Sequence, residues 1–129
     1  MMGTNFYLMT SDRQKRDKWF DEYECELTDT PEWGYEVHIA KTSCGWKPLF
    51  EAHKRIRSVR DIKAAISDGF RVVDEYGTFY NLDEFVDRVV KFNAENQDAI
   101  SHQCYDGCRY ANDHFLDTEG YEFAQYSFS

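Results

Sequence analysis

The stretch YEVHIAKTSCGW, residues 35–46, carries the strongest strand pattern in the chain. Every second residue from Tyr35 to Ile39 is apolar, and this period of two is typical of a strand with one buried face. Gly45 is expected to end the strand. The segment that follows, residues 49–53, begins with the apolar pair Leu49-Phe50 and is expected to pair back against the strand. The stretch therefore predicts a sheet built around residues 35–43.

Capping and turn signals on either side predict the other elements. Ser11 or Asp12 can cap a first helix, Ser58 a second, and Asn81 with Glu84 a third. The expected elements are a strand at 5–9, a helix from there to about residue 20, a strand at 22–27 with a helical alternative, a helix at 58–67, two short strands around a turn within 71–80, a helix at 82–94, a helix around 97–105 and a strand at 121–128. This mixture predicts an α+β fold: a single compact domain over residues 1–129, with a largely antiparallel sheet and two to four short helices.

Composition narrows the class of protein. Three Trp, nine Tyr and ten Phe favour a folded globule over a disordered chain. No apolar run approaches the roughly 20 residues that a membrane helix needs, and we expect neither a secretory signal nor membrane association. The net charge of −9 opposes binding to nucleic acid, because phosphates repel an acidic surface. The four cysteines are then expected to be reduced thiols, which indicates a cytosolic protein.

Acidic residues are concentrated in one segment. The stretch from Trp19 to Ala40 contains seven carboxylates and no lysine or arginine. It can form an ordinary solvated face, or an acidic surface that binds a basic partner. The candidate partner-binding residues are Asp21, Glu22, Glu24, Glu26, Asp29 and Glu32.

A second candidate site lies at the end of the predicted central strand. Lys41 could bind a phosphate or carboxylate there, with His38 as a hydrogen-bond partner or base and Trp46 as an aromatic wall. Strict alternation would place Lys41 and Ser43 on the side of Ile39, opposite His38. A purely structural interpretation stays open, in which Lys41 extends to solvent, Ser43 caps a turn and Trp46 packs in the core. The nearest expected carboxylates are those of Asp74 and Glu75.

Two further clusters have weaker patterns. Four zinc-capable side chains occur close together, although a C-x3-C spacing and ordinary buried cysteines allow a structural interpretation. The weak metal candidates are His102, Cys104, Cys108 and His114. The basic stretch 54–63 is interpreted as a solvated helix face rather than a phosphate-binding strip. No cofactor is predicted apart from a possible zinc ion, and the residues leave open whether any reaction is catalysed.

Several motifs together resemble one family of proteins. MGTNFY (2–7), HIAKTSCGW (38–46), DEYGTFYNLDEF (74–85) and EGYEF near the end of the sequence follow one another in the order found in a family of small bacteriophage proteins of uncharacterised function. Members of that family open M-G-T-N-[FY]-Y and carry H-[IL]-G-K-x-S-x-G-W. Ala40 stands where relatives usually have Gly, and Cys25 is single where many relatives have C-x-x-C. The resemblance implies a phage-encoded protein in the cytoplasm of the infected bacterial host, and it implies no activity, cofactor or partner.

The acidic segment and the resemblance together give the leading hypothesis. We expect an accessory protein that binds a host or defence protein with a basic surface, and modulates or inhibits it. The first alternative is a protein or enzyme that binds a small phosphate-bearing ligand at His38, Lys41, Ser43 and Trp46. The second alternative is a structural zinc module around Cys104 and Cys108.

Overall fold

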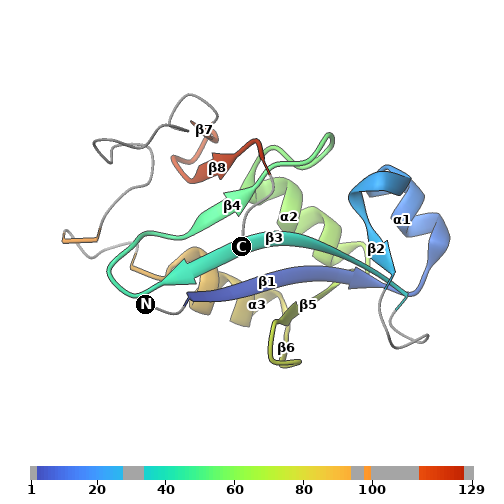
Figure 1. Cartoon of the computed structure of the whole chain (residues 1–129), viewed down its shortest axis with the longest axis horizontal. Coiled ribbons are helices and arrows are strands. Elements are labelled where there is room, and N and C mark those ends of the chain that lie inside the picture. Colours follow the sequence, from blue (N-terminus) through green and yellow to red (C-terminus); the bar gives the residue numbers. More distant parts are fainter. Residues whose placement is uncertain (1–2, 28–33, 94–97, 100–113, 127–129) are drawn as a thin grey trace.

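The computed structural model describes residues 3–27, 34–93, 98–99 and 114–126. These residues form one sheet with helices, a compact α+β fold as expected (Figure 1). The strands are β1 (Gly3–Thr10), β2 (Glu26–Leu27), β3 (Tyr35–Ser43), β4 (Leu49–Glu51), β5 (Arg71–Asp74), β6 (Phe79–Tyr80), β7 (His114–Leu116) and β8 (Glu122–Ala124). The helical elements are α1 (Arg13–Trp19), the 3₁₀ turn η1 (Glu22–Glu24), α2 (Val59–Ser67), α3 (Leu82–Phe85) and the π-helical turn η2 (Val86–Val90).

The sheet is largely antiparallel, with β1 and β3 at its centre. Its strand order is β6-β5-β1-β3-β4-β8-β7, and β2 adds to β3 outside this path. The β1–β3 pair runs from Gly3 opposite Ser43 to Thr10 opposite Tyr35. Every described pairing is antiparallel except that of β4 with β8, which is parallel. The expected back-pairing of residues 49–53 is confirmed for β4.

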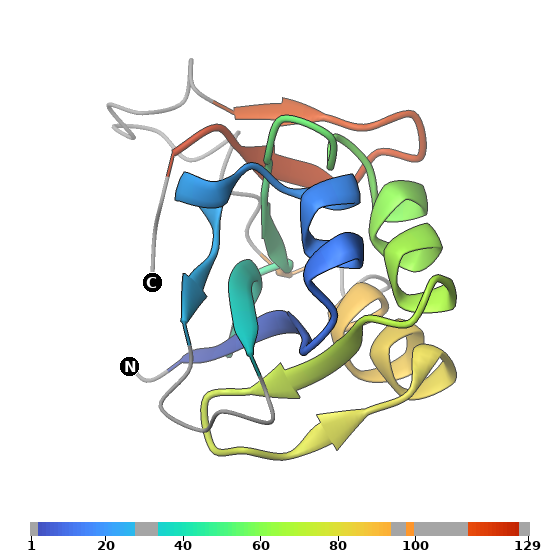
Figure 2. The ribbon, with the colours of Figure 1, turned by 90° about the vertical axis from the view of Figure 1, so that its right-hand side faces the viewer.

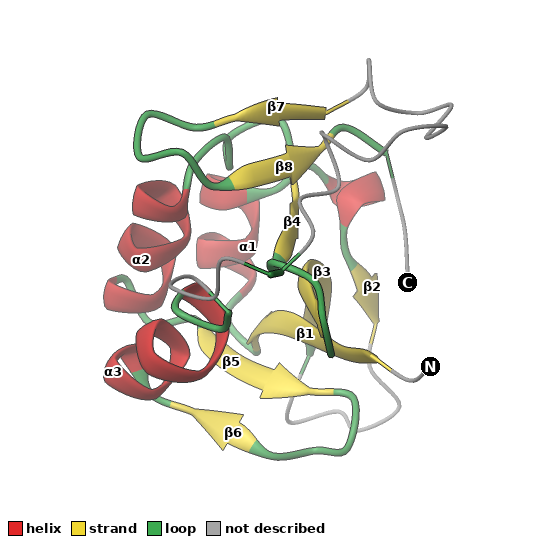
Figure 3. Cartoon of the chain, turned by 90° about the vertical axis from the view of Figure 1, so that its left-hand side faces the viewer, coloured by secondary structure: helices red, strands yellow, loops and turns green. Residues whose placement is uncertain are grey.

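Helices α2 and α3 cover one face of the sheet (Figures 2 and 3). Ile62 of α2 and Phe85 of α3 are fully buried and belong to the same core cluster as Val72, Phe50 and Phe123 of the sheet. Burial of each such side chain contributes roughly 1.5–3 kcal/mol to stability. The opposite face of the central strands is not covered by α2 or α3, and we call it the helix-free face. It carries several polar side chains.

The local capping signals are confirmed. The Asp12 side chain accepts hydrogen bonds from the backbone N–H groups of the first turn of α1, and Ser58 Oγ accepts one from Asp61 at the start of α2. Asn81 and Glu84 form the expected capping box of α3. In the 71–80 hairpin, the turn glycine Gly77 has a φ of 87°, a conformation that glycine adopts without steric cost.

The predicted helix at 82–94 is too long and too regular. After Phe85 the chain widens into η2, where the Lys91 N–H donates to the Val86 carbonyl oxygen at 2.9 Å. Asn93 then adopts a φ of 56°, which ends the helical path. Its side-chain amide donates to the Trp46 carbonyl oxygen at 2.8 Å, so a contact distant in sequence fixes this end.

The predicted strand at 22–27 is wrong over its first half. Residues 22–24 form η1, because the Glu24 carboxylate accepts the Asp21 N–H at 2.6 Å and closes a capping box. Only Glu26 and Leu27 join the sheet, where they pair antiparallel with Glu36 and Tyr35. Alternation of Glu with apolar residues fits a strand, but it fits this turn equally well.

Strict alternation along the central strand is also wrong, because β3 contains a bulge. Phe6 lies opposite Ala40 and Tyr7 opposite His38, which leaves Ile39 as an extra residue. Val37, Ala40 and Thr42 are buried, whereas the half-exposed residues are His38, Lys41 and Ser43. The bulge thus moves Lys41 and Ser43 from the expected core side to the side of His38.

The last predictions concern the C-terminal third of the sequence. The predicted strand at 121–128 is observed as the shorter β8, and β7 was not expected. The predicted helix around 97–105 falls almost wholly outside the described residues. Within the part of the chain that the structure describes, no helix has the length and apolar character that crossing a membrane requires.

Candidate functional site

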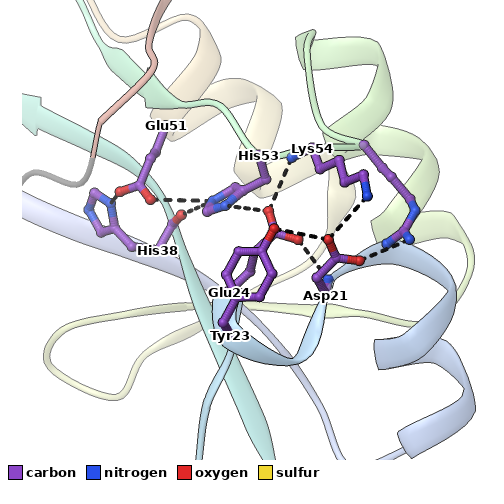
Figure 4. Close-up of polar contacts among 8 residues, drawn as sticks. Asp21, Tyr23, Glu24, His38, Glu51, His53 and Lys54 are labelled. Carbon is purple, nitrogen blue, oxygen red and sulfur yellow. Dashed lines mark hydrogen bonds and ion pairs between the residues drawn. The ribbon is translucent and has the colours of Figure 1, made fainter.

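Histidine and glutamate side chains with little exposure contact one another in a row that runs from η1, past the end of β4, to β3 (Figure 4). Its members are Glu24 of η1, His53 after β4, Glu51 of β4 and His38 of β3, and we call it the histidine–carboxylate chain. The side chains of these four residues are between 7% and 12% exposed. Ionised groups at this depth are costly unless each one meets an opposite charge or a hydrogen-bond partner.

His38 has an oxygen acceptor at each ring nitrogen. Nδ1 lies 2.8 Å from Glu51 Oε1, and Nε2 lies 2.9 Å from Asn5 Oδ1. The Asn5 amide nitrogen faces Glu75 Oε1 at 3.5 Å, which leaves its oxygen turned towards the imidazole. Both ring nitrogens therefore contact an oxygen atom, which fixes the orientation of the imidazole between Glu51 and Asn5.

His53 repeats this arrangement on the other side of Glu51. Its Nε2 donates to the His38 carbonyl oxygen at 2.8 Å and lies 3.5 Å from Glu51 Oε2. Its Nδ1 lies 3.4 Å from Glu24 Oε2. The His53 ring therefore lies between two carboxylates, and the four side chains form one connected row from Glu24 to His38.

The Glu24 end of the histidine–carboxylate chain fixes the short turn η1. Glu24 Oε2 accepts the Lys54 backbone N–H at 3.1 Å, while Oε1 closes the capping box. Asp21 binds Arg55 Nη2 at 3.0 Å and lies 3.5 Å from Lys54 Nζ. Burial of Asp21 opposes ionisation, but the Tyr23 hydroxyl and the charges of Lys54 and Arg55 outweigh it and lower the pKa of Asp21.

The bulge brings three of the predicted pocket residues to one face. Gly3 lies opposite Ser43 and Asn5 opposite Lys41, and Asn5 in turn contacts His38. A Cβ atom at Gly3 would lie 2.5 Å from Ser43 Oγ and 2.6 Å from Lys41 Cε. The missing side chain of Gly3 therefore leaves the space that the Lys41 stem and the Ser43 hydroxyl occupy.

Trp46 belongs to the turn after β3 rather than to this face. Its backbone N–H donates to the Ser43 carbonyl oxygen at 3.1 Å, and its backbone carbonyl oxygen accepts a hydrogen bond from the Asn93 side-chain amide. Its side chain is half-buried. The structure therefore groups His38, Lys41 and Ser43 by strand pairing and places Trp46 beyond the strand end.

Asp74 and Glu75 point to different partners. Asp74 is buried, and its carboxylate accepts the N–H groups of Tyr76 and Thr78 and the hydroxyl of Tyr80. This carboxylate shapes the β5–β6 turn. Glu75 Oε1 instead accepts the Asn5 N–H at 2.8 Å, so Glu75 joins the site through Asn5.

The candidate partner-binding carboxylates fall into three groups. Asp21 and Glu24 bind cationic or N–H groups of this chain, as described above. Glu22 and Glu26 lie in η1 and β2, and the structure does not describe their side chains. Asp29 and Glu32 lie outside the described residues. Glu24 therefore has a structural role within this surface.

The zinc candidates cannot be assembled from the described residues. His102, Cys104 and Cys108 lie outside them. His114 is buried, with Nδ1 bonded to Glu122 and Nε2 lying 2.7 Å from the Tyr126 hydroxyl. In the described ranges no group of three or more His, Cys, Asp or Glu side chains could hold a metal ion.

Sequence patterns missed four members of the site: Asn5, Tyr7, Glu51 and His53. The Tyr7 ring packs edge-on against His38, with centroids 5.4 Å apart. One available signal was the pair Glu51 and His53, because titratable residues two apart in a strand share a face. Their partners lie far away in sequence and have no local signature.

Comparison of the chain with protein-family models, with curated proteins and with solved structures finds no match. The chemistry must therefore be judged from the geometry. The histidine–carboxylate chain fixes charges and turns through hydrogen bonds that its members make with one another. Its physical effect is to hold the helix-free face and η1 in one rigid arrangement.

The first prediction concerns Glu51, which lies between both histidines. Glu51→Gln keeps the shape but removes the carboxylate that contacts both imidazole rings, so the free energy of unfolding should fall by about 2 kcal/mol. The free energy of unfolding of the wild type and the variant is measured by urea unfolding. The control Asp87→Asn, at an exposed site, should change stability by less than about 0.5 kcal/mol. An equally small change for Glu51→Gln would contradict the electrostatic role.

The second prediction concerns Tyr80. Burial, its hydrogen bond to Asp74 and the charge of Asp74 raise the pKa of Tyr80 to about 12, whereas a tyrosine in an unfolded chain titrates near 10. The folded state holds this proton more tightly, so the stabilisation is complete below about pH 10 and is lost as the pH rises towards about 12. Urea unfolding at about pH 9 and about pH 11 should show a smaller loss of stability for Tyr80→Phe than for the wild type. The same loss in both proteins would refute this linkage, and Tyr76→Phe is the control.

Proposed function

We propose that this protein is a phage-encoded accessory factor that binds a basic surface of a host or defence protein in the cytoplasm of the infected bacterium. The described part of the proposed contact surface, which we call the η1 surface, is Asp21 and Tyr23. We propose that the acidic residues near them in the sequence also contribute to it: Glu22, Glu26, Asp29 and Glu32. One observation carries the proposal. Tyr23 is 83% exposed, yet it projects from a turn that buried polar contacts fix in place.

An exposed tyrosine on a rigid turn suits protein recognition. Tyrosine is enriched among interface residues that dominate binding energy, because a large amphipathic ring loses little rotamer freedom. The turn below it is fixed by the Asp21–Glu24 capping box and by Glu24 with His53 and the Lys54 N–H. A partner would meet Tyr23 on a turn that is already ordered, which lowers the entropic cost of association.

Asp21 beside Tyr23 is already paired with Arg55 and Lys54, so the preference for a cationic partner rests on the acidic residues that flank Tyr23 in the sequence and on the net charge. The Tyr23 hydroxyl donates to Asp21 Oδ2 at 3.1 Å, and this bond together with the charge of Asp21 raises the pKa of Tyr23. The phenol therefore stays neutral beside the Asp21 carboxylate. The net charge of −9 adds a long-range attraction that speeds association with a basic surface. The phage origin and the host compartment rest on the sequence resemblance.

The third prediction removes the exposed ring. Once a basic protein has been captured from host lysate and identified, Tyr23→Ala should weaken its affinity tenfold or more, about 1.4 kcal/mol, measured by surface plasmon resonance. Tyr76→Ala is the matched control, because Tyr76 is 66% exposed at the β5–β6 turn and makes no part of the η1 surface. Equal affinity of the wild type and Tyr23→Ala would exclude Tyr23 as the anchor.

A charge-reversal variant tests the acidic residues of this surface separately from the carboxylates that bind groups of this chain. Glu22→Lys, Asp29→Lys and Glu32→Lys together leave Asp21 and Glu24 in their contacts with this chain. Association of the wild type should slow as salt rises, and the triple variant should lose most of that salt dependence. An unchanged association rate in the variant would remove these acidic residues from the contact.

The bulge in β3 favours a second candidate function, the binding of a small phosphate-bearing ligand. It places Lys41 and Ser43 on the side of His38, so cationic and hydroxyl groups share one face. Lysine is a common phosphate-binding residue, and its ammonium group can bind a phosphate oxygen while the Ser43 hydroxyl donates to another.

The fourth prediction tests this candidate by thermal shift. A panel of inorganic phosphate, nucleoside phosphates and sugar phosphates should contain a compound that raises Tm, because a ligand present at 100 times its Kd adds about 2.7 kcal/mol. Lys41→Ala should abolish the shift, whereas Lys91→Ala, at an exposed position, should retain it. A shift that survives Lys41→Ala, or no stabilising compound in the panel, would refute the candidate.

A further inference from the structure

A hollow of about 270 Å³ is lined by residues that belong to neither surface considered above. The segment just before β4 forms one wall, with Pro48, and η2 contributes Val90. The β7–β8 hairpin closes the hollow with Leu116 and Tyr121. Leu116 is 52% exposed, which is unusual for a large aliphatic side chain in this molecule. The walls are therefore apolar on several sides.

Carboxylates give this hollow its polarity. Glu119 and Glu122 both line it, and Glu122 is buried and oriented by its bond to His114. Lys47 is the cation among the lining residues, so acidic groups outnumber basic ones there. Burial raises the pKa of the Tyr121 phenol, and the negative charges of Glu119 and Asp117 raise it further. The same charges that disfavour a phenolate would stabilise a bound cation.

The hairpin that carries these groups is rigid. Asp117 Oδ1 accepts the N–H groups of Glu119 and Tyr121, each at 2.9 Å, and its Oδ2 accepts the Val59 N–H at 2.9 Å. The Tyr121 ring packs edge-on against Phe50, with centroids 6.1 Å apart. The turn is thus fixed to α2 and to the sheet, and a ligand would meet preformed walls.

We propose that this hollow binds an arginine side chain of a partner protein. The aliphatic stem packs against Pro48, Val90 and Leu116, and the guanidinium lies beside Glu119 and the Tyr121 ring. Arginine fits better than lysine, because its planar and weakly hydrated head can stack on an aromatic face while it binds a carboxylate. The inference stands on the hollow alone. It can fail while the η1 surface still binds its partner, and the reverse also holds.

The test uses three small probes with the isotope-labelled protein. N-acetyl-arginine methylamide should shift the amide signals of Leu116, Gly120 and Tyr121 in nitrogen–proton NMR spectra, with a Kd on the order of millimolar because the contact is small. The citrulline analogue has nearly the same shape without the charge, and it should bind at least about fivefold more weakly. The lysine analogue should bind more weakly than arginine. Equal shifts from the citrulline probe would overturn the proposal.

Two variants and one control assign the shifts to the hollow. Glu119→Gln removes a carboxylate whose side chain makes no described bond within the hairpin, and it should weaken binding of the arginine probe at least about fivefold. Leu116→Trp should block entry, because it adds bulk at an exposed site without disturbing the core. Asp87→Asn removes the same charge outside the hollow and should leave binding unchanged. Binding that persists in both hollow variants, or that falls equally in the control, would refute the site.

Discussion

The extra residue in β3 is the constraint on which the helix-free face depends. A strand of strict alternation would turn Lys41 towards the helices, where an ammonium group is costly, and would expose Thr42. The bulge at Ile39 keeps Val37 and Ala40 in the core and returns Lys41 to solvent. One inserted position thus reconciles an apolar core with a polar face on the same strand.

Elements set by a few neighbouring residues could be predicted from the sequence. Ser58, Asn81 and the Asp74–Gly77 turn each depend on contacts within about four residues, and each forms as expected. The bulge could not be predicted, because it depends on how Phe6 and Tyr7 of β1 meet β3. The site was only partly predictable for the same reason. His38 was visible in the sequence, but its partners Asn5 and Glu51 become neighbours through strand pairing.

Three histidines among the described residues each contact at least one glutamate carboxylate. His38, His53 and His114 each lie beside a glutamate, at Glu51, at Glu24 with Glu51, and at Glu122. Pairs of this kind cost desolvation energy, and they stabilise the fold only when their geometry satisfies every donor and acceptor. No buried side-chain nitrogen or oxygen among the described residues lacks a hydrogen-bond partner. These pairs can therefore specify one arrangement of the strands, even though apolar residues contribute most of the stability.

The parallel pairing of β4 with β8 has a consequence for how the chain acquires its shape during synthesis. Phe50 can pair with Phe123 only after β8 has been synthesised, and the two residues are separated by more than half of the sequence. A ribosome would release β1, β3 and β4 well before β8 emerges, so the edge of β4 stays unpaired for that interval. Closing so large a loop is slow compared with forming a hairpin. An intermediate with this open edge is where a chaperone would act, or where two nascent copies would join by mistake.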